Sequence, residues 1–200
     1  MLIDLLKKRY SCRNFSDRKI DGEIVEYMLE CGRLSASGGN EQPWKFGVVT
    51  NPETIEKIAE AAGVNYSQAW IAKAPLIIVL CTQLFDTACE EIGMNRFPSL
   101  HQKLQKIDRD IYARVNMEEH QTKIPGEHMV LAALEHGVYS TWVSSIDCES
   151  AGRLIGIEGY IVTNVIAFGY PEETRDVTPK KDLSGITFTN NFANSGYTVE

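Results

Sequence analysis

The chain has 200 residues, of which 44% are hydrophobic and 24% are charged, a composition typical of one soluble globular domain. Its net charge of −7 argues against general binding to nucleic acid or to an anionic membrane, because both partners require a basic face. No apolar run approaches the roughly 20 residues of a membrane span, and the first residues lack the pattern of a signal peptide. The sequence therefore predicts a cytoplasmic protein.

The first predicted elements are two helices, one over residues 2–9 and one that begins after Asp21 and runs to about residue 35. Asp21 is a suitable N-cap, because apolar residues then recur at helical spacing. A strand over 45–50 follows. Asn51-Pro52 opens another helix, with proline at a permitted early position.

The middle of the chain predicts one strand and two helices. Residues 76–81 are an unbroken apolar run, which is typical of a strand covered on both faces. Residues 100–117 have the pattern of an amphipathic helix. Residues 125–137 are apolar nearly all round, so we expect a central buried helix there, with Gly137 as its C-cap.

Two further strands are predicted at 139–145 and 160–168, with a helix over 148–155 between them. A short β-prone piece at 186–189 precedes a polar tail. Four principal strands among about six helices indicate one α+β domain over 1–200. They do not alternate as in a doubly wound sheet, and no Gly-x-Gly-x-x-Gly follows any strand, so a bound nucleotide would be held in another way.

The most informative stretch places two arginines on either side of one serine, at Arg9, Ser11 and Arg13. In an extended backbone these three residues share one face. Two guanidinium groups and a hydroxyl on one face are well matched to a phosphate monoester. The alternative interpretation is that Lys7, Lys8 and Arg9 only complement the C-terminal end of the first helix.

The second informative stretch is the segment 35–44, Ser-Ala-Ser-Gly-Gly-Asn-Glu-Gln-Pro-Trp. Small residues let a planar ligand approach the backbone, and Asn40 and Gln42 offer amide donors and acceptors. The alternative interpretation is an ordinary helix end followed by a loop. Together with the arginine–serine pattern, however, this segment points to one known family.

The chain resembles the FMN-dependent nitroreductases, which share Arg-x-Ser-x-Arg/Lys-x-Phe, here at 9–15, and Ser-x-x-Asn-x-Gln-Pro-Trp, here at 37–44. Ala74-Pro75 before the apolar strand is similar to the family's second strand. Residues 127–143 are similar to its central helix and following strand. Gly169-Tyr170-Pro171 with Pro179-Lys180-Lys181 resembles its closing motif, so the resemblance covers essentially the whole chain.

The resemblance implies a central, mixed but mainly antiparallel sheet flanked by helices, in an intertwined homodimer with two FMN sites at the interface. The segment 85–123 would hold variable helices that shape substrate access. The extension 184–200 would pack on the partner subunit, with 186–189 added there as an edge strand.

The resemblance also implies the site residues. The phosphate and ribityl chain would be held by the first motif, Arg9, Tyr10, Ser11 and Arg13, with a further cation from Lys180 or Lys181. The partner would contribute Ser37, Gly38 and Asn40, with Gln42 a weaker candidate. Ser144 and Ser145 match the turn whose backbone N–H groups lie beside flavin N5, where family members often have Glu-Gly.

The implied activity is that of an NAD(P)H oxidoreductase reducing nitroaromatics, quinones or similar acceptors by ping-pong hydride transfer through flavin N5. The flavin carries the chemistry, so no catalytic side chain is required. Three alternatives stay open: a specialised relative such as a reductive dehalogenase or ring dehydrogenase, a non-catalytic flavin-binding protein, and a domain that binds another phosphate.

Other conspicuous residues have simpler interpretations. The five cysteines, an odd number without any Cys-x-x-Cys pair, indicate free thiols in a reducing compartment. His128 and His136 are eight residues apart, which favours packing over metal ligation, and we expect no metal site. Cys12 lacks a nearby histidine that would make it a nucleophile. Trp70 is the aromatic residue most open to a substrate role.

Overall fold

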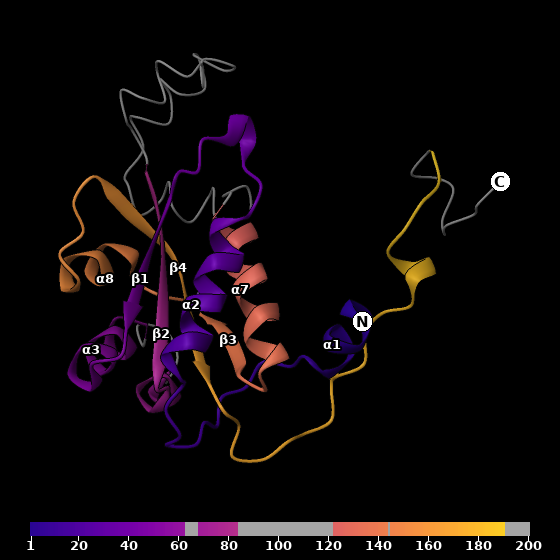
Figure 1. Ribbon diagram of the computed structural model, residues 1–200, viewed down its shortest axis with the longest axis horizontal. Helices are drawn as coiled ribbons and strands as arrows, with labels where there is room; N and C mark the ends of the chain where they lie inside the picture. Colours follow the sequence, from indigo (N-terminus) through magenta and orange to yellow (C-terminus); the bar gives the residue numbers. More distant parts are fainter. Residues whose placement is uncertain (63–67, 84–121, 144, 191–200) are drawn as a thin grey trace.

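The computed structural model describes residues 1–62, 68–83, 122–143 and 145–190 (Figure 1). The predicted helix over 100–117 lies outside the described residues, as does nearly all of the variable segment 85–123. Among the residues that the structure describes, no helix is long and apolar enough to cross a membrane.

A four-stranded sheet forms the centre, in the order β1-β2-β4-β3, and all three pairings between its strands are antiparallel. The strands are β1 (Trp44–Val49), β2 (Leu76–Gln83), β3 (Tyr139–Val143) and β4 (Tyr160–Gly169). The mixed character comes from one isolated parallel bridge, between Ser11 and Ser140. The expected α+β class and mainly antiparallel sheet are confirmed, although β3 ends at Val143 and not at residue 145.

Helices cover both faces of the sheet (Figure 1). The covering helices are α2 (Gly22–Arg33), α3 (Pro52–Ala62), α7 (Lys123–Glu135) and α8 (Cys148–Leu154). The first helix, α1 (Leu2–Lys8), has no buried residue and lies to one side of the sheet (Figure 1). Short 3-10 turns lie at Gly38–Asn40, Ala69–Lys73 and Leu183–Gly185. In β2, Ile77 and Val79 pack toward α3 and α8, whereas Ile78 and Leu80 pack toward α2 and α7. This confirms that the apolar run is covered on both faces.

The central helix α7 is buried through most of its length, as its sequence predicted. It ends in a Schellman motif, in which the Gly137 N–H donates to the Leu134 carbonyl at 3.1 Å and the Val138 N–H to the Ala133 carbonyl at 3.0 Å. Gly137 has a φ of +72° and follows the C-cap position, which His136 occupies. Glycine suits this place because it adopts the left-handed conformation without a steric penalty.

The segment after α1 runs in extended form along the free edge of β3. The Cys12 N–H donates to the Ser140 carbonyl at 3.0 Å, and the Thr141 hydroxyl donates to the Cys12 carbonyl. Phe15 is buried against Gly169, where a Cβ atom would lie 2.7 Å from the Phe15 ring. These contacts fix the arginine–serine motif, residues 9–13, to the sheet.

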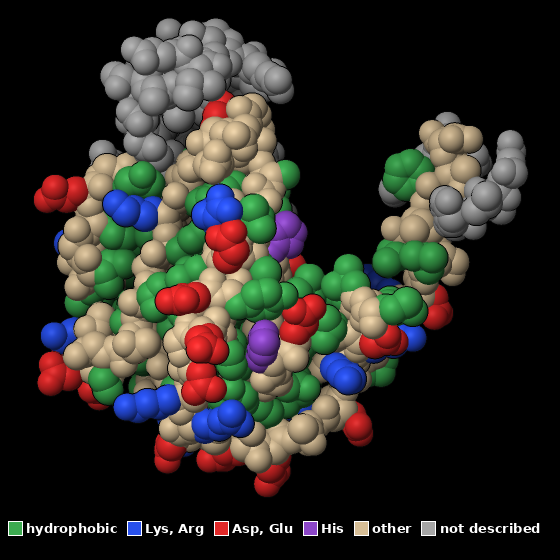
Figure 2. Space-filling model, viewed as in Figure 1, with side chains coloured by type: hydrophobic (Ala, Val, Ile, Leu, Met, Phe, Trp, Pro, Cys, Tyr) green, Lys and Arg blue, Asp and Glu red, His purple; other side chains and the backbone are tan. Residues whose placement is uncertain are grey.

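The chain after β4 leaves the body of the molecule and continues as a C-terminal arm, residues 183–190 of the described chain (Figure 1). Its hydrophobic side chains Leu183, Ile186 and Phe188 are exposed, as are Leu2 and Ile3 of α1. Figure 2 shows these two parts of the chain standing beside the main body with hydrophobic side chains at their surfaces.

Candidate flavin-binding site

The motif at 9–13 alternates between two faces. Tyr10 and Cys12 are buried toward the body, whereas Ser11 and Arg13 are directed away from it together with the half-buried Arg9. The extended backbone after α1 produces this alternation, because successive side chains of a strand point to opposite sides. The prediction that Arg9, Ser11 and Arg13 share one face is therefore confirmed.

These three residues line one small pocket of about 160 Å³. The lining consists of Arg9, Tyr10, Ser11, Arg13, Arg175, Val177, Thr178 and Lys180. None of these described residues is acidic, so the pocket combines four cationic side chains with two hydroxyl groups beside the Tyr10 ring. Its volume equals that of about five water molecules in the liquid, which is suited to a phosphate group. Charged and forked donors of this kind bind phosphate strongly.

Arg175 is the member of this pocket that sequence reasoning missed. It donates a hydrogen bond of 2.5 Å to the Ser11 carbonyl, and its guanidinium carbon lies 4.7 Å from the centre of the Tyr10 ring. Only its charge, a few residues after Gly169-Tyr170-Pro171, could have drawn attention to it. Lys180 lines the pocket, whereas its neighbour Lys181 is not among the described lining residues.

The residues after β4 reach the pocket because they run beside the N-terminal motif. Phe15 and Pro171 form an antiparallel bridge, and the Asn14 amide donates to a Glu172 carboxylate oxygen at 2.6 Å. The Tyr10 hydroxyl donates to the Glu173 carbonyl at 3.3 Å. Burial is the largest cause that raises the Tyr10 pKa, so this phenol stays protonated at neutral pH.

Cys12 lies inside the motif but has the properties of a structural thiol. Burial raises its pKa, and this outweighs the hydrogen bond to the Asn14 carbonyl and the nearby Arg175 and Arg13 charges that lower it. A thiol with a raised pKa is a poor nucleophile at neutral pH. The simple interpretation of Cys12 is therefore supported.

Trp70 lies beneath the same motif. The Arg13 guanidinium carbon is 5.7 Å from the centre of the Trp70 ring, and the centres of the Phe15 and Trp70 rings are 6.5 Å apart. Its indole N–H donates to Gln68 at 2.8 Å. These contacts make Trp70 a support for Arg13.

The second candidate segment forms a tight loop at the C-terminal end of α2. The loop places Ser37, Gly38, Asn40 and Gln42 close together, because the Gln42 N–H donates to the Ser37 hydroxyl at 3.0 Å and the Gln42 side chain donates to the Asn40 carbonyl at 3.3 Å. None of these four lines the arginine pocket. Figure 1 shows the loop at the opposite end of the molecule from the segment that follows α1.

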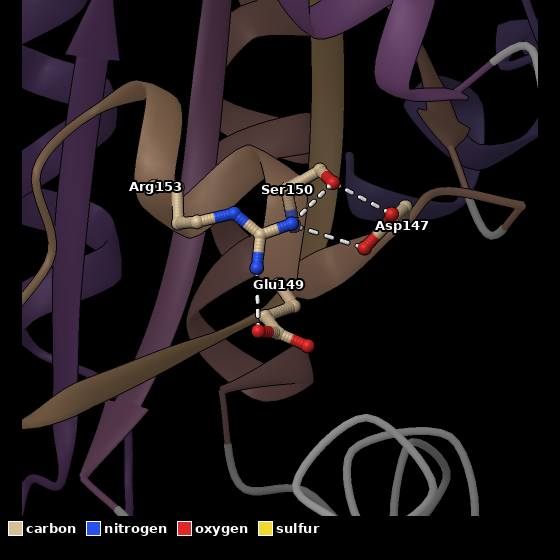
Figure 3. Close-up of polar contacts among 4 residues, drawn as sticks. All are labelled: Asp147, Glu149, Ser150 and Arg153. Atoms are coloured by element: carbon tan, nitrogen blue, oxygen red, sulfur yellow. Dashed lines mark hydrogen bonds and ion pairs between the residues drawn. The ribbon is translucent and has the colours of Figure 1, made fainter.

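The turn after β3 holds the last two predicted residues. Ser144 lies outside the described residues, and Ser145 is half-buried just before α8. Asp147 caps α8 by accepting the Ser150 N–H at 2.9 Å and the Ser150 hydroxyl at 2.7 Å (Figure 3). These hydrogen bonds lower the pKa of Asp147, so the cap remains ionised at neutral pH and fixes the end of the turn.

His128 of α7 and its C-cap residue His136 each contact a side chain from α2 or from the loop after it. The His128 Nδ1 atom lies 2.7 Å from the Ser35 hydroxyl, and the His136 ring meets Tyr27 edge-on at 5.2 Å. Within the described ranges, no three side chains of histidine, cysteine or acidic type are grouped as a metal site would require.

Comparisons with known proteins place the chain among related sequences and structures. A putative NADH dehydrogenase/NAD(P)H nitroreductase of Archaeoglobus fulgidus is 29% identical over 179 residues, which cover 87% of each protein. An iodotyrosine dehalogenase 1 homolog of Caenorhabditis elegans is 32% identical over 147 residues, 70% of this chain and 44% of that protein. The solved NADPH:FMN oxidoreductase from Vibrio harveyi complexed with NAD+ has a TM-score of 0.74 at 18% identity, and the match covers 96% of this chain and 77% of that one.

The family model described as Nitroreductase family matches residues 6–170. This range includes the motif after α1, the loop after α2 and the whole sheet. The chain therefore belongs to the nitroreductase family.

Proposed function

We propose that the protein is an FMN-dependent NAD(P)H oxidoreductase that reduces small planar acceptors, such as nitroaromatics or quinones, in a ping-pong cycle. Family membership and the names of its relatives support the class of reaction. The observation that carries the proposal is the small pocket with four cationic side chains and no acidic one among its described lining residues. In a protein of net charge −7, an anionic ligand needs such a local cluster.

The pocket fits the phosphate end of FMN. Arg9, Ser11 and Arg13 would hold the phosphate, with Arg175 and Lys180 closing the other side. A phosphate monoester carries close to two negative charges at neutral pH and offers several acceptor oxygens, so it can use guanidinium, ammonium and hydroxyl donors together. The Tyr10 ring stacks under Arg175 and holds it in place. We assign Lys181 at most a long-range electrostatic contribution.

The loop after α2 would serve the flavin of a partner subunit in a homodimer. Within one chain this loop and the arginine pocket lie at opposite ends of the molecule, so one chain presents two separated half-sites (Figure 1). We assign Ser37, Gly38, Asn40 and Gln42 to the partner-side contact. The exposed apolar side chains of α1 and of the C-terminal arm support an interface between subunits.

When bound, FMN supplies the redox chemistry, taking a hydride at N5 from NADH or NADPH and passing the electrons to the acceptor. The chain's part is to bind, orient and stabilise charge. Backbone N–H groups of Ser144 and Ser145 are assigned to the ring edge, where donors favour negative charge on the reduced ring. The segment 85–123 is assigned to substrate access and the extension 184–200 to the partner. Three described cysteines, Cys12, Cys31 and Cys81, are free thiols, which supports a reducing cytoplasm.

The test is an anaerobic titration. The purified protein, incubated with FMN and desalted, should be yellow, should bleach with NADH or NADPH, and should recolour with menadione or a nitrofuran. A protein that stays colourless contradicts flavin binding. A yellow protein that neither nicotinamide bleaches would contradict NAD(P)H as the electron donor and would favour another electron source.

Reductive dehalogenation is a second candidate, favoured by the 32% identity to the dehalogenase homolog. The two activities can be separated with one preparation of reduced protein. Release of iodide from iodotyrosine at a rate comparable to menadione reduction would favour the dehalogenase. Menadione turnover without iodide release would favour the reductase.

A further inference from the structure

We infer that His128 is a positioning residue for the flavin-contacting loop, residues 35–43, which it anchors through Ser35. This inference rests on the proposed function, because it concerns the loop assigned to the partner's flavin. Ser35 is the first residue of that loop and is only 6% exposed. Its hydroxyl lies 2.7 Å from the His128 Nδ1 atom, which comes from a different helix, α7.

The contact does not depend on the histidine tautomer. If Nδ1 is unprotonated, it accepts the Ser35 hydroxyl proton. If Nδ1 carries a hydrogen, it donates to the hydroxyl oxygen, and the hydroxyl proton can turn to the Cys31 carbonyl, 3.5 Å away. In both cases one hydrogen lies between the two atoms, so the link between α7 and the loop persists.

The packing of α2 on α7 brings these two side chains together. The Tyr27 hydroxyl donates to Glu135 at 2.7 Å near one end of the helix pair. Farther along, Gly32 lies against Met129, whose methyl carbon would be 2.2 Å from a Cβ atom placed on Gly32. The absence of a side chain at Gly32 therefore permits the close approach that places His128 beside Ser35, at the point where α2 ends.

The loop needs an anchor because its backbone is strained. Asn40 and Gln42 have φ angles of +58° and +48°, values that residues with side chains rarely adopt. Such conformations persist only where their surroundings hold them. Inside the loop, Ser37 accepts the Gln42 N–H, and at the far end Pro43 is buried. The Ser35–His128 hydrogen bond holds the near end.

The experiment measures hydrogen exchange of the loop amides in the full-length protein, together with FMN affinity by fluorescence titration. His128→Ala should accelerate exchange in 35–43 and weaken FMN binding by about two- to tenfold, the range of one net hydrogen bond. Ser35→Ala should do the same, and the double variant should add nothing further. His128→Asn should keep the exchange of 35–43 and the FMN affinity close to those of the parent. The side-chain amide nitrogen of asparagine is separated from Cα by the same number of bonds as the histidine Nδ1 atom, so it can make the same hydrogen bond to Ser35.

His136→Ala is the matched control, since it removes a second histidine from the end of the same helix. It should leave the exchange of 35–43 and FMN affinity as in the parent. The inference is wrong if His128→Ala matches the parent in both measurements, or if His136→Ala loosens the loop equally. If His128→Ala fails to fold, Ser35→Ala and His128→Asn decide the question. If the parent binds no FMN, the proposed function fails, while the exchange data still test the anchor.

Discussion

Arg13 and Arg175 reach one pocket from opposite ends of the chain, and each is supported by an aromatic ring. Arg13 lies over Trp70, and Arg175 lies over Tyr10. A guanidinium that rests on a ring keeps its forked donors directed outward and loses less freedom when it binds. The two rings thus hold both guanidinium groups of the pocket in place without a ligand.

Replacing Arg13 tests this organisation. Arg13→Ala should weaken FMN binding about ten- to hundredfold, because a hydrogen bond to a charged group contributes about 1.5–3 kcal/mol. Fluorescence titration of the apoprotein measures the effect. Arg153→Ala is the control for the lost charge, because Arg153 lies exposed on α8 and bonds only to Glu149 and Ser150 among the described residues (Figure 3). Equal weakening by both variants would contradict a specific phosphate contact.

The difference between the predicted and the missed pocket residues has a physical cause. Arg9, Ser11 and Arg13 share a face through local backbone geometry alone, so their alternation in the sequence is sufficient to predict it. Arg175 joins them only because the chain after β4 runs beside the first motif. A tertiary contact of this kind leaves no local pattern in the sequence.

At the scale of elements, the end of β4 controls where the first motif lies. Gly169 accommodates the Phe15 ring and Pro75, which would lie 2.7 and 2.9 Å from an added Cβ atom. Gly169→Ala should therefore destabilise the fold by about 1–3 kcal/mol, a typical effect of overpacking. It should also weaken FMN binding, because a shifted Phe15 moves the residues before it.

Urea unfolding and flavin titration measure these two effects. Gly22→Ala is the matched control, since nothing lies within 4 Å of a Cβ atom there and the site is the start of a helix. A Gly169→Ala protein with parental stability would show that the close approach of Phe15 is unimportant.

The α2–α7 pair has a hydrogen bond that depends on pH. The bond to Glu135 is the largest cause that raises the Tyr27 pKa to about 12. Because the Tyr27 pKa is higher in the folded than in the unfolded state, the Tyr27–Glu135 hydrogen bond stabilises the fold fully at pH values below the ordinary tyrosine pKa of about 10. It is then lost as the pH rises through about 12. Tyr27 is exposed, so its contribution should stay below about 1 kcal/mol.

Comparison of the parent with Tyr27→Phe tests this dependence. The difference in their free energies of unfolding should be constant between pH 7 and 9 and should shrink above about pH 10. Urea unfolding at several pH values measures it. If the difference grew with pH, the pKa of Tyr27 would be lowered and not raised by folding.

Elements defined by local features of the sequence were predicted well, whereas the role of a segment that depends on a partner is untested. The all-round apolar character of α7 and the glycine after it defined that helix, because both features are local. The β-prone residues 186–189 follow a 3-10 turn and lie outside the four-stranded sheet. A β-prone sequence forms a strand only where a neighbouring strand pairs with it, and for residues 186–189 that neighbour would belong to a partner subunit. The role of this segment as a partner's edge strand stays a prediction.

For the whole molecule, the proposal that one chain carries two separated half-sites predicts that flavin binding and subunit association are linked. A ligand held only by the dimer stabilises the dimer, so FMN should lower the concentration at which subunits dissociate. The C-terminal arm stands off the body with apolar side chains exposed, so it is the part of the described chain that we expect to pack on a partner (Figure 2).

Charging the arm tests this linkage. The double variant Leu183→Asp/Ile186→Asp should shift light scattering toward the monomer mass and weaken FMN binding at least tenfold, because each monomer retains only the phosphate half of the site. Both side chains are more than 60% exposed, so folding of the subunit should be unaffected. Leu154→Asp, which charges an exposed leucine on α8, should remain dimeric and bind FMN as the parent does. A charged-arm variant that stays dimeric shows that the arm does not hold the subunits together, whereas a monomer with parental FMN affinity places both halves of the flavin site within one chain.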